Sequence, residues 1–250
     1  MRALPAIVLL LSALPAAAAA ADSAKPSARI GIGLAKPPYI MESGKAGLEY
    51  EIAEKALAAA GVRMVPVQLP PARGLAMFRA GQLDGLLTVD RGIGSVGHFS
   101  DAYIDYQNVA VTLARRGIML SSIGDLARHS MAGFQNAHAI LGEEFRAVTE
   151  RHAAYKEHAH QLTQVRLLYA GRVDVAVGDR LILRYFSRHL GPSIDATQPV
   201  VYHNLFPLRP RHAVFRDSEL RDRFNEGLRS IRASGTYDAI LKKYQAYMQP

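Results

Sequence analysis

Strand-like and helix-like hydrophobic patterns alternate over residues 28–89, and this alternation constrains the fold more than any other feature of the chain. Short apolar runs predict three strands, at 28–34, 62–69 and 83–89. Apolar residues at helical spacing predict two helices between them, at 47–60 and 70–80. Gly61 and Gly81 follow these helices, where glycine commonly ends a helix. Because strand–helix–strand connections are right-handed, this order predicts a parallel sheet with helices on its faces.

A second α/β unit begins after Arg115-Arg116-Gly117, which ends a strand predicted at 107–113. It is expected to contain strands at 130–134 and 173–178 and helices at 123–127, 140–150, 162–170 and 179–189. Two final helices, 217–233 and 234–247, have no strand of their own, so we expect them to pack on the first lobe. The chain then crosses between the lobes near 109–114 and near 201–207. These crossings divide it into lobe 1 (27–110 and 203–250) and lobe 2 (111–202).

Residues 1–21 have the pattern of an export signal. Arg2 supplies the positive start, 3–14 the apolar run, and Ala19 to Ala21 a small-residue cleavage site. A membrane-spanning helix needs about 20 strongly apolar residues, whereas the end of this stretch contains only alanine and proline. We therefore expect the signal to be removed and the protein to work in the periplasm of a Gram-negative bacterium. The alternative is an uncleaved N-terminal anchor.

The absence of cysteine excludes a lipoprotein anchor and a disulfide scaffold. Removing 21 of the 250 residues leaves 229, enough for two modest lobes with a core. The formal charge is +8, and because Arg2 belongs to the signal the mature chain carries about +7. The basic residues are scattered, which indicates a basic surface rather than a nucleic-acid-binding stripe. We expect a monomer with no nucleic-acid partner.

A set of short motifs resembles one known family, in the same order and over nearly all of the mature chain. They are Pro37-Pro38-Tyr39, Gly47 to Ala53 (GLEYEIA), Arg79 to Gly85 (RAGQLDG), Phe99 to Tyr103 (FSDAY), Ile123 to Leu126 (IGDL), Gly171 to Asp179 (GRVDVAVGD) and Ser234 to Ile240 (SGTYDAI). Together they resemble the family 3 periplasmic solute-binding proteins, the receptors of polar-amino-acid ABC transporters. The resemblance implies a two-lobe hinged α/β fold, each lobe a mixed sheet flanked by helices, with two crossovers. It also implies a small ligand, an amino acid or small carboxylate, and an inner-membrane ABC permease as partner, without metal or cofactor.

The same resemblance suggests an anion-binding arginine. Thr88-Val89-Asp90-Arg91 is similar to the family's "TxxR" segment, in which a guanidinium fork matches the two oxygens of a ligand carboxylate. Thr88 and Arg91 are therefore candidate ligand-binding residues. In the alternative interpretation Arg91 is an exposed loop arginine paired with Asp90 or Asp101.

Asp179 and Tyr39 are further candidates implied by the family pattern. Asp179 occupies the position where a carboxylate binds the ligand ammonium, although it also precedes a predicted helix and could simply be an N-cap. Tyr39 resembles an aromatic wall of the cleft, and its alternative is a core tyrosine with a satisfied hydroxyl.

The chain departs from the family at two ligand-binding segments, which puts specificity for standard α-amino acids in doubt. Gly85-Leu86-Leu87 replaces small hydroxyl residues ahead of "TxxR", and Asn136-Ala137 replaces a "GT" that opens a lobe 2 helix. The helix start at Asn136 could still offer backbone amides to an anion. Arg73, in the first turn of the predicted helix 70–80, is another cleft candidate.

The sequence evidence for an enzyme is weak. The chain contains no HExxH zinc motif and no GxSxG nucleophile motif, so we expect no catalytic residues. Two alternatives stay open beside a transport receptor. One is a periplasmic cyclohexadienyl dehydratase on the same fold, which would need a general acid in the cleft, and the other is a receptor that feeds a sensor.

Overall fold

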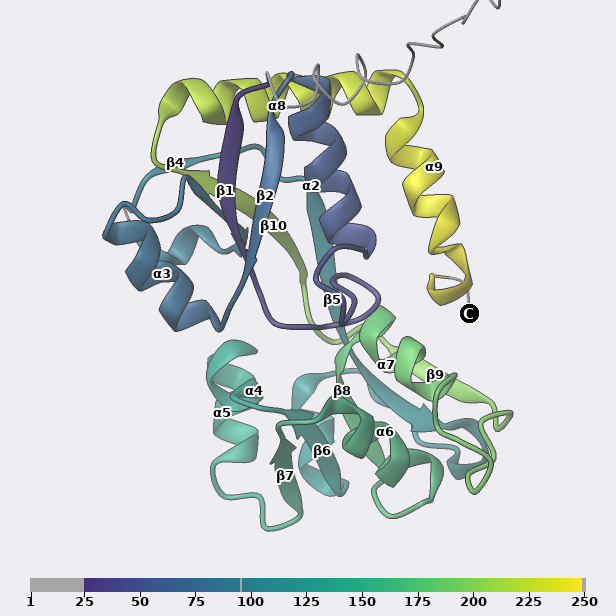
Figure 1. The fold of residues 1–250 in the computed structure, drawn as a ribbon. Coiled ribbons are helices and arrows are strands. Elements are labelled where there is room, and N and C mark those ends of the chain that lie inside the picture. The colour runs from purple at the N-terminus through teal and green to yellow at the C-terminus, as the bar shows by residue number, and fades with distance from the viewer. Residues whose placement is uncertain (1–24, 95, 249–250) are drawn as a thin grey trace, which may run out of the picture.

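The computed structural model describes residues 25–94 and 96–248. They form two lobes, an upper one containing both ends of the described chain and a lower one formed by its middle part (Figure 1). Each lobe is a mixed sheet flanked by helices, and the chain passes between the lobes twice, as the sequence predicts. The predicted export signal, 1–21, lies outside the described residues. Within the described ranges no helix has the length and apolar character needed to span a bilayer.

Three strands from the start of the chain and one from its end build the sheet of lobe 1. β1 (Ser27–Ile32) lies between β2 (Arg63–Gln68) and β3 (Gly85–Val89), and these three strands are parallel. β10 (Leu208–Phe215) is antiparallel beside β3 and also pairs with the short β4 (His98–Phe99). Parallel strands place their carboxyl ends at one edge of a sheet, and in Figure 1 this edge faces lobe 2.

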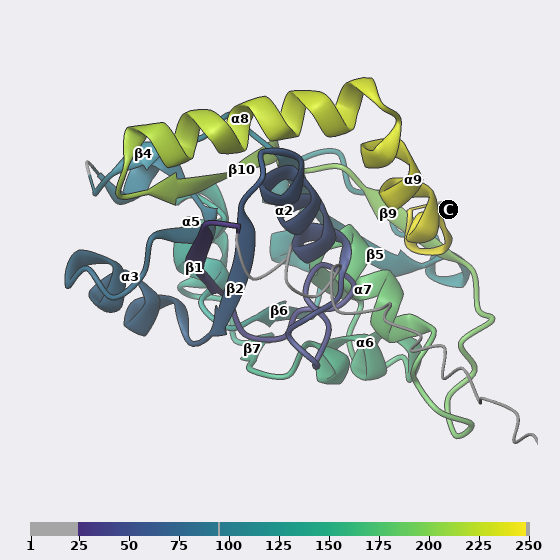
Figure 2. The same ribbon diagram turned by 45° about the horizontal axis from the view of Figure 1, so that its top comes forward.

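Four helices cover the lobe 1 sheet. α2 (Leu48–Ala59) and α3 (Pro71–Arg79) connect the parallel strands, and α8 (Ser218–Ala233) and α9 (Thr236–Lys243) return from the end of the chain. Figure 2 shows α8 lying across the upper edge of this lobe, beside α2. Side chains of α8 and α9 are buried in one core with those of β1 and α2, which confirms that the C-terminal helices pack on lobe 1.

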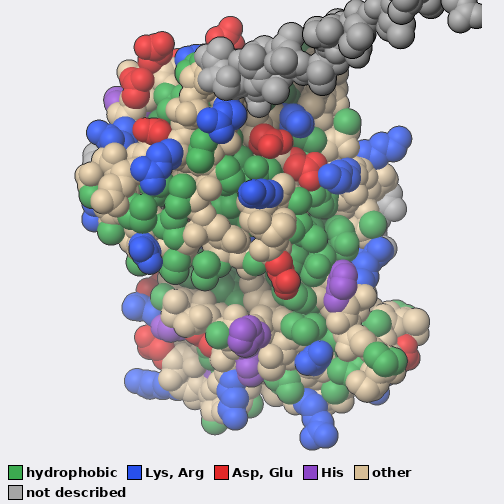
Figure 3. Space-filling model, in the orientation of Figure 1, with side chains coloured by type: hydrophobic (Ala, Val, Ile, Leu, Met, Phe, Trp, Pro, Cys, Tyr) green, Lys and Arg blue, Asp and Glu red, His purple; other side chains and the backbone are tan. Residues whose placement is uncertain are grey.

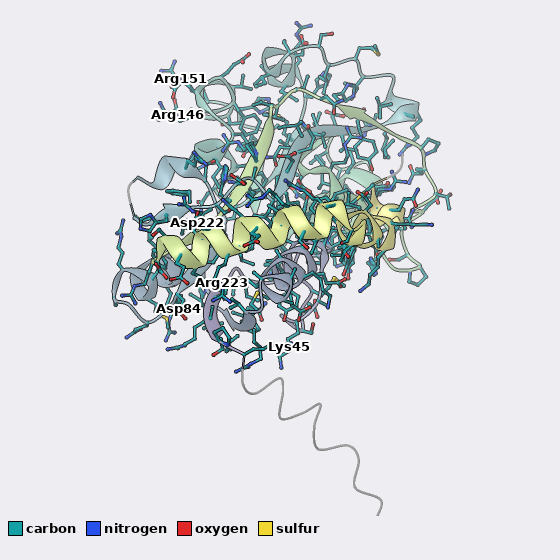
Figure 4. The ribbon with its side chains drawn as sticks, turned by 90° about the horizontal axis from the view of Figure 1, so that it is seen from above. Lys45, Asp84, Arg146, Arg151, Asp222 and Arg223 are labelled. Carbon is teal, nitrogen blue, oxygen red and sulfur yellow. The ribbon has the colours of Figure 1, made fainter. Side chains whose placement is uncertain are left out.

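The contact between α2 and α8 depends on Gly227. A Cβ atom at this position would lie 1.9 Å from the carbonyl oxygen of Ala56, closer than real side chains approach a backbone. Arg223, labelled on α8 in Figure 4, donates a hydrogen bond of 2.8 Å to the carbonyl of Ala60 just after α2 ends. The two helices are therefore in backbone contact.

Lobe 2 repeats the α/β arrangement with different elements. β6 (Met131–Phe134) lies between β7 (Tyr155–His158) and β8 (Val175–Asp179), and all three are parallel. The surrounding elements are the 3₁₀ helix η3 (Ile123–Arg128) and helices α4 (Ala137–Ile140), α5 (Glu143–Thr149), α6 (Gln161–Tyr169) and α7 (Arg180–Ser187). Two clusters of buried apolar side chains form its core.

One long strand belongs to both lobes. β5 (Ile104–Leu113) pairs with β10 up to Gln107, and from Asn108 onward it pairs with β8 and with β9 (Val200–His203). The chain returns through the four residues 204–207, between β9 and β10. The division predicted at 110/111 falls inside β5, and the lobe limits stay a prediction.

α7 also joins the lobes. Its neighbouring residues Ile182 and Leu183 are both buried, but Ile182 packs in the core of lobe 1 and Leu183 in a core of lobe 2. At its carboxyl end the ring of Tyr185 lies 5.4 Å from that of Tyr247, in the final 3₁₀ turn η4 (Gln245–Tyr247). In Figure 1 α7 is on the side of the molecule away from α3 and α4.

The sequence patterns missed four strands, β4, β7, β9 and β10. β4 contains two residues and β7 and β9 four each, which is too short for a clear alternation. β10 contains Pro210, a residue that argues against a strand. The helix predicted over 140–150 is α5, which begins only at Glu143; α4 ends at Ile140, and Gly142 between the two helices takes a φ of 104°.

Candidate ligand-binding site

A pocket of about 380 Å³ opens at the carboxyl ends of β1 and β3, beside the first turns of α3. Its walls are largely apolar: Gly31, Ile32, Leu69, Pro71, Ala72, Gly74, Leu75, Leu86, Leu87 and Val89. Four polar side chains also line it: Lys36, Thr88, Asp90 and Arg211. Ligands of open α/β sheets bind beyond the carboxyl ends of the strands, in pockets that are mostly apolar with a few polar groups. All these residues belong to lobe 1, so lobe 2 contributes nothing to the pocket in this conformation. Figure 3 shows hydrophobic side chains along the junction of the two lobes.

A buried carboxylate supports the polar side of the pocket. Glu49 is 0% exposed. Its Oε1 accepts hydrogen bonds from the hydroxyls of Thr88 and Tyr103, and its Oε2 accepts one of 2.6 Å from Tyr106. The Lys36 ammonium lies 3.2 Å from the same Oε2 and donates to Thr88 Oγ1 at 2.9 Å. One carboxylate therefore fixes the positions of two pocket side chains, Lys36 and Thr88.

The start of α2 places Glu49 at this point. The N–H groups of Leu48 and Glu49 donate to the carbonyls of Pro38 and Tyr39, at 2.9 and 3.0 Å. Gly47 permits this approach, because a Cβ there would lie 2.2 Å from the carbonyl oxygen of Tyr39. The loop after β1 and the helix that follows are thus held together where the network begins.

The electrostatics of the network favour an ionised Glu49. Burial alone would raise the pKa of Glu49, but the Lys36 ammonium and the three hydroxyl donors outweigh it and hold that pKa below its ordinary value. Burial lowers the pKa of Lys36, against the opposing attraction of Glu49. Burial, followed by the charge of Glu49, raises the pKa of Tyr103 and of Tyr106 well above the ordinary value, so both stay neutral donors.

Thr88 has a strained backbone. Its φ of 59° lies in the left-handed region, which is uncommon for a β-branched residue. Besides its hydroxyl contacts, its N–H donates to Tyr103 Oη at 3.0 Å. Strained residues of this kind cluster at functional sites. The structure thus brings Thr88, a predicted ligand-binding residue, into the pocket wall.

Arg211 of β10 provides a guanidinium at the pocket wall that sequence reasoning did not identify. It stacks over the ring of Tyr106, with 5.3 Å between the guanidinium carbon and the ring centroid. Its Nη1 lies 3.4 Å from Asp90 Oδ2, and Arg209 Nη1 lies 3.6 Å from the same oxygen. Charge-assisted hydrogen bonds are usually about 2.7–2.9 Å, so these contacts are loose. Arg211 Nε has no hydrogen-bond partner among the described residues.

Asp179 and Tyr39 contact each other rather than the pocket. Asp179 Oδ1 accepts from the N–H groups of Leu181 and Ile182 and so caps α7. Its Oδ2 accepts from Tyr39 Oη at 3.1 Å and from the N–H of Gln107 at 3.0 Å. Burial raises the pKa of Asp179 to about 6, partly offset by these four donors. The capping interpretation accounts for Asp179 in this conformation, and its ligand role stays a prediction.

The backbone N–H groups at the helix start near Asn136 already have an acceptor. Asn136 has a left-handed backbone, and its N–H donates to Glu157 Oε2 at 2.6 Å. The other oxygen of Glu157 accepts from the N–H of His138 at 2.8 Å and from the hydroxyl of Tyr155 at 2.8 Å. A carboxylate of this chain thus satisfies the amides that the sequence suggested for a ligand anion.

The two arginines predicted at the site lie outside the lining of the pocket. Arg91 is exposed, donates to the carbonyl of Ser100 at 3.4 Å and lies 6.0 Å from the ring centroid of Phe99. Arg73 is exposed on α3, the helix that borders the pocket. Their roles stay predictions. No group of three or more His, Asp or Glu side chains in residues 25–94 and 96–248 is arranged to hold a metal ion.

Glu49, Lys36 and Arg211 are the site residues that the sequence analysis missed. Glu49 carried a usable signal, because it lies on the same helical face as Ile52, Ala53 and Ala56, and a charge on a core-facing stripe needs a partner. Lys36 and Arg211 gave no such signal. Lys36 lies in a loop, and Arg211 in the strand that was not predicted.

Two hinged α/β lobes, with a pocket at the strand ends facing the junction, define the class of two-lobe ligand-binding proteins. The sequence model of the bacterial extracellular solute-binding proteins, family 3, matches residues 28–247. The chain belongs to this family. A search of curated proteins found no match.

Solved structures show the same fold. An ancestral arginine-binding protein bound to arginine has 22% sequence identity and a TM-score of 0.65, covering 88% of this chain and 98% of its own. A histidine kinase sensor domain with similarity to periplasmic binding proteins has 21% identity and a TM-score of 0.68, covering 89% and 97%. An ancestral amino-acid-binding protein described as a precursor of cyclohexadienyl dehydratase has 19% identity and a TM-score of 0.64, covering 87% and 95%. At these identities the likeness concerns the fold.

Proposed function

We propose that this protein captures a small polar ligand, an amino acid or a related carboxylate, between its two lobes and delivers it to an ABC permease. The observation that carries the proposal is the pocket of about 380 Å³ at the carboxyl ends of β1 and β3, with cationic side chains on one wall. Family membership supports ligand capture, since the matching family consists of solute-binding proteins. The pocket faces the junction of the lobes, which suits a mechanism in which ligand contacts with both lobes favour a closed state.

A thermal-shift screen of amino acids, small carboxylates and a neutral sugar as control tests this function. A ligand at about 100 times its Kd adds about 2.7 kcal/mol of stability. For a chain of this size that corresponds to a Tm increase of about 5–10 °C. The neutral sugar should leave Tm unchanged. The proposal fails if no amino acid or carboxylate raises Tm.

The export signal supports a periplasmic location. The purified periplasmic protein should begin at Asp22 or within a few residues of it, because Ala19 to Ala21 form the small-residue cleavage site. Intact-mass measurement tests this, and a mass that retains Met1 contradicts it.

The dehydratase alternative has a direct control. Prephenate incubated with the protein should be recovered unchanged if the pocket only binds. Conversion of prephenate with release of CO2 and water, at a rate proportional to protein concentration, would replace the receptor function by an enzymatic one.

A further inference from the structure

Two cations, Lys36 and Arg211, and one carboxylate, Asp90, line the pocket. Lys36 pairs with Glu49 at 3.2 Å, whereas Arg209 and Arg211 share the single carboxylate of Asp90 at 3.6 and 3.4 Å. One carboxylate from a ligand would complete the pairing of Arg211, whereas a phosphate group, with a charge of about −1.5 to −2, would bring more negative charge than that pairing needs.

Arg211 is the cation best placed to meet that anion. Lys36 is held by Glu49 and by Thr88 Oγ1, whereas the ion pair of Arg211 is long and its Nε has no partner in the described chain. The side chain lines the pocket, and its stacking on Tyr106 fixes the plane of the guanidinium. The planar guanidinium of an arginine matches the two oxygens of a carboxylate better than the ammonium of a lysine does.

The groups that could receive a ligand ammonium are already bonded. Asp179 accepts four hydrogen bonds, one of them from Tyr39, and does not line the pocket. Glu49 accepts from three hydroxyls and pairs with Lys36. Asp90 accepts from the N–H of Gly92 through one oxygen and faces the arginines with the other. In this conformation the acceptor open to an ammonium in the pocket is Asp90 Oδ2, which two arginines already face, so the ammonium would lose its hydration and meet like charges, which is unfavourable.

The remaining pocket surface suits an apolar group. Leu69, Leu75, Leu86 and Leu87, together with Pro71 and Ala72, surround the space between α3 and the ends of β1 and β3. Gly31 and Gly74 let these leucines pack closely against the backbone, since a Cβ at Gly31 would lie 2.5 Å from the Leu86 side chain and a Cβ at Gly74 would lie 3.0 Å from the Leu69 side chain.

Resting on the solute-binding function proposed above, we propose that the ligand is a monocarboxylate with an apolar body and no ammonium group. Its carboxylate contacts Arg211, with Lys36 and Thr88 alongside, and its body fills the leucine-rich part of the pocket. The chain is then a receptor for organic acids rather than for α-amino acids.

Two matched series of compounds test the ligand class by calorimetry. One is phenylalanine, 3-phenylpropanoate and 2-phenylethylamine, and the other is leucine, 4-methylpentanoate and 3-methylbutylamine. Within each series the apolar body is constant while the ammonium or the carboxylate is removed. The deaminated acid should bind at least about tenfold more tightly than the amino acid, and the amine should not bind. An amino acid that binds as tightly as its deaminated acid overturns the inference.

Arginine variants test the anchor. Arg211→Gln should weaken binding of the preferred acid by about tenfold or more, because it removes a desolvated charge partner. Arg209→Gln changes the same charge on the same strand and near the same Asp90, but Arg209 does not line the pocket, so it should cost less than about threefold. Arg146→Gln, on α5 of lobe 2 (Figure 4) and outside the pocket lining, should have no effect. Melting curves confirm that each variant is folded.

The outcomes separate this inference from the proposed function. If the two series fail but other amino acids bind in the broader screen, the solute-binding function holds and the monocarboxylate inference is overturned. If no compound binds at all, both are overturned. Equal losses for Arg209→Gln and Arg211→Gln would show that overall charge rather than contact holds the anion, and would overturn Arg211 as the anchor.

Discussion

At the residue level, a single carboxylate organises the polar side of the pocket. Glu49 is buried among three hydroxyl donors and one ammonium, and two of these partners, Lys36 and Thr88, form part of the pocket wall. Thr88 keeps a left-handed backbone within this network. The network therefore links the stability of lobe 1 to the shape of its ligand site.

Breaking the Lys36–Glu49 pair should be costly. Glu49→Gln removes the counter-charge of a mostly buried ammonium, and we expect a loss of about 3–5 kcal/mol in the free energy of unfolding. Adding Lys36→Met removes the ammonium that has lost its counter-charge, and it should restore part of the lost unfolding free energy. Urea unfolding of the single and double variants measures the coupling. Strictly additive losses would show that the two groups do not interact.

Asp179 should give a measurable pH dependence of stability. Burial raises its pKa from 3.8 to about 6 in the folded protein, so the folded state binds this proton more tightly than the unfolded state does. Its stabilising contribution is complete below the unfolded pKa and is lost as the pH rises through about 6. The shift of about two pKa units corresponds to about 3 kcal/mol. The difference in unfolding free energy between wild type and Asp179→Asn, which keeps a good N-cap residue, should fall by about this amount from pH 4 to pH 7.

Asp125→Asn provides the control for that experiment. Backbone N–H donors from Ser121 and Ser122 lower the pKa of Asp125, so its contribution is present above the unfolded pKa and lost at low pH. The wild-type minus variant difference should therefore change in the opposite direction. A flat profile for Asp179→Asn would contradict the raised pKa.

The sequence predicts some of these residues better than others. Thr88 follows a recognisable motif and lies at the pocket, and Glu49 could have been found from its place on a core-facing helix stripe. Arg211 could not, because a segment that contains both cations and a proline resembles a loop, and only the pairing of β10 with β5 sets Arg211 beside Tyr106. Sequence order cannot predict such a tertiary neighbour.

At the level of elements, the first helices and strands were predictable because each has a long, regular hydrophobic period. Three of the four missed strands have only two to four residues, and their stability depends on partners distant in the sequence, such as β9 on β5. The packing of α8 on α2 illustrates the same limit. The periodicity indicated that α8 needed a partner, but the close approach at Gly227 follows only from the tertiary structure.

Gly227→Ala should destabilise the protein. The added methyl group would lie 1.9 Å from the Ala56 carbonyl oxygen, so one helix must shift. We expect a loss of about 1–3 kcal/mol in unfolding free energy, as for other overpacked sites. Gly124→Ala is the matched control, because the nearest atom to its new methyl group would be Ser122 Oγ at an ordinary 3.6 Å. Equal denaturation midpoints for the two variants would contradict the predicted clash.

At the level of the whole molecule, the pocket is lined by one lobe, and the other must approach to enclose a ligand. Scattering from the protein saturated with its tightest-binding compound should therefore give a smaller radius of gyration than the free protein, because hinge closure expels water from between the lobes. Arg211→Gln with the same compound at the same concentration is the control, and its radius of gyration should decrease less, in proportion to its lower occupancy. An unchanged profile for wild type with calorimetrically proven binding would show that the lobes do not close.

The division of α7 between two cores determines where such motion can be large. Because Ile182 and Leu183 are adjacent in the chain but anchored in different lobes, neither lobe can move far at this helix without exposing a buried side chain. We therefore expect α7 to be the pivot of the lobe motion, and α3 and α4, on the opposite side in Figure 1, to be the helices that move farthest. A small rotation about this pivot would produce a wide displacement at the mouth of the pocket. Since the chain has no cysteine of its own, thiol labels introduced on α3 and α4 would report that displacement alone.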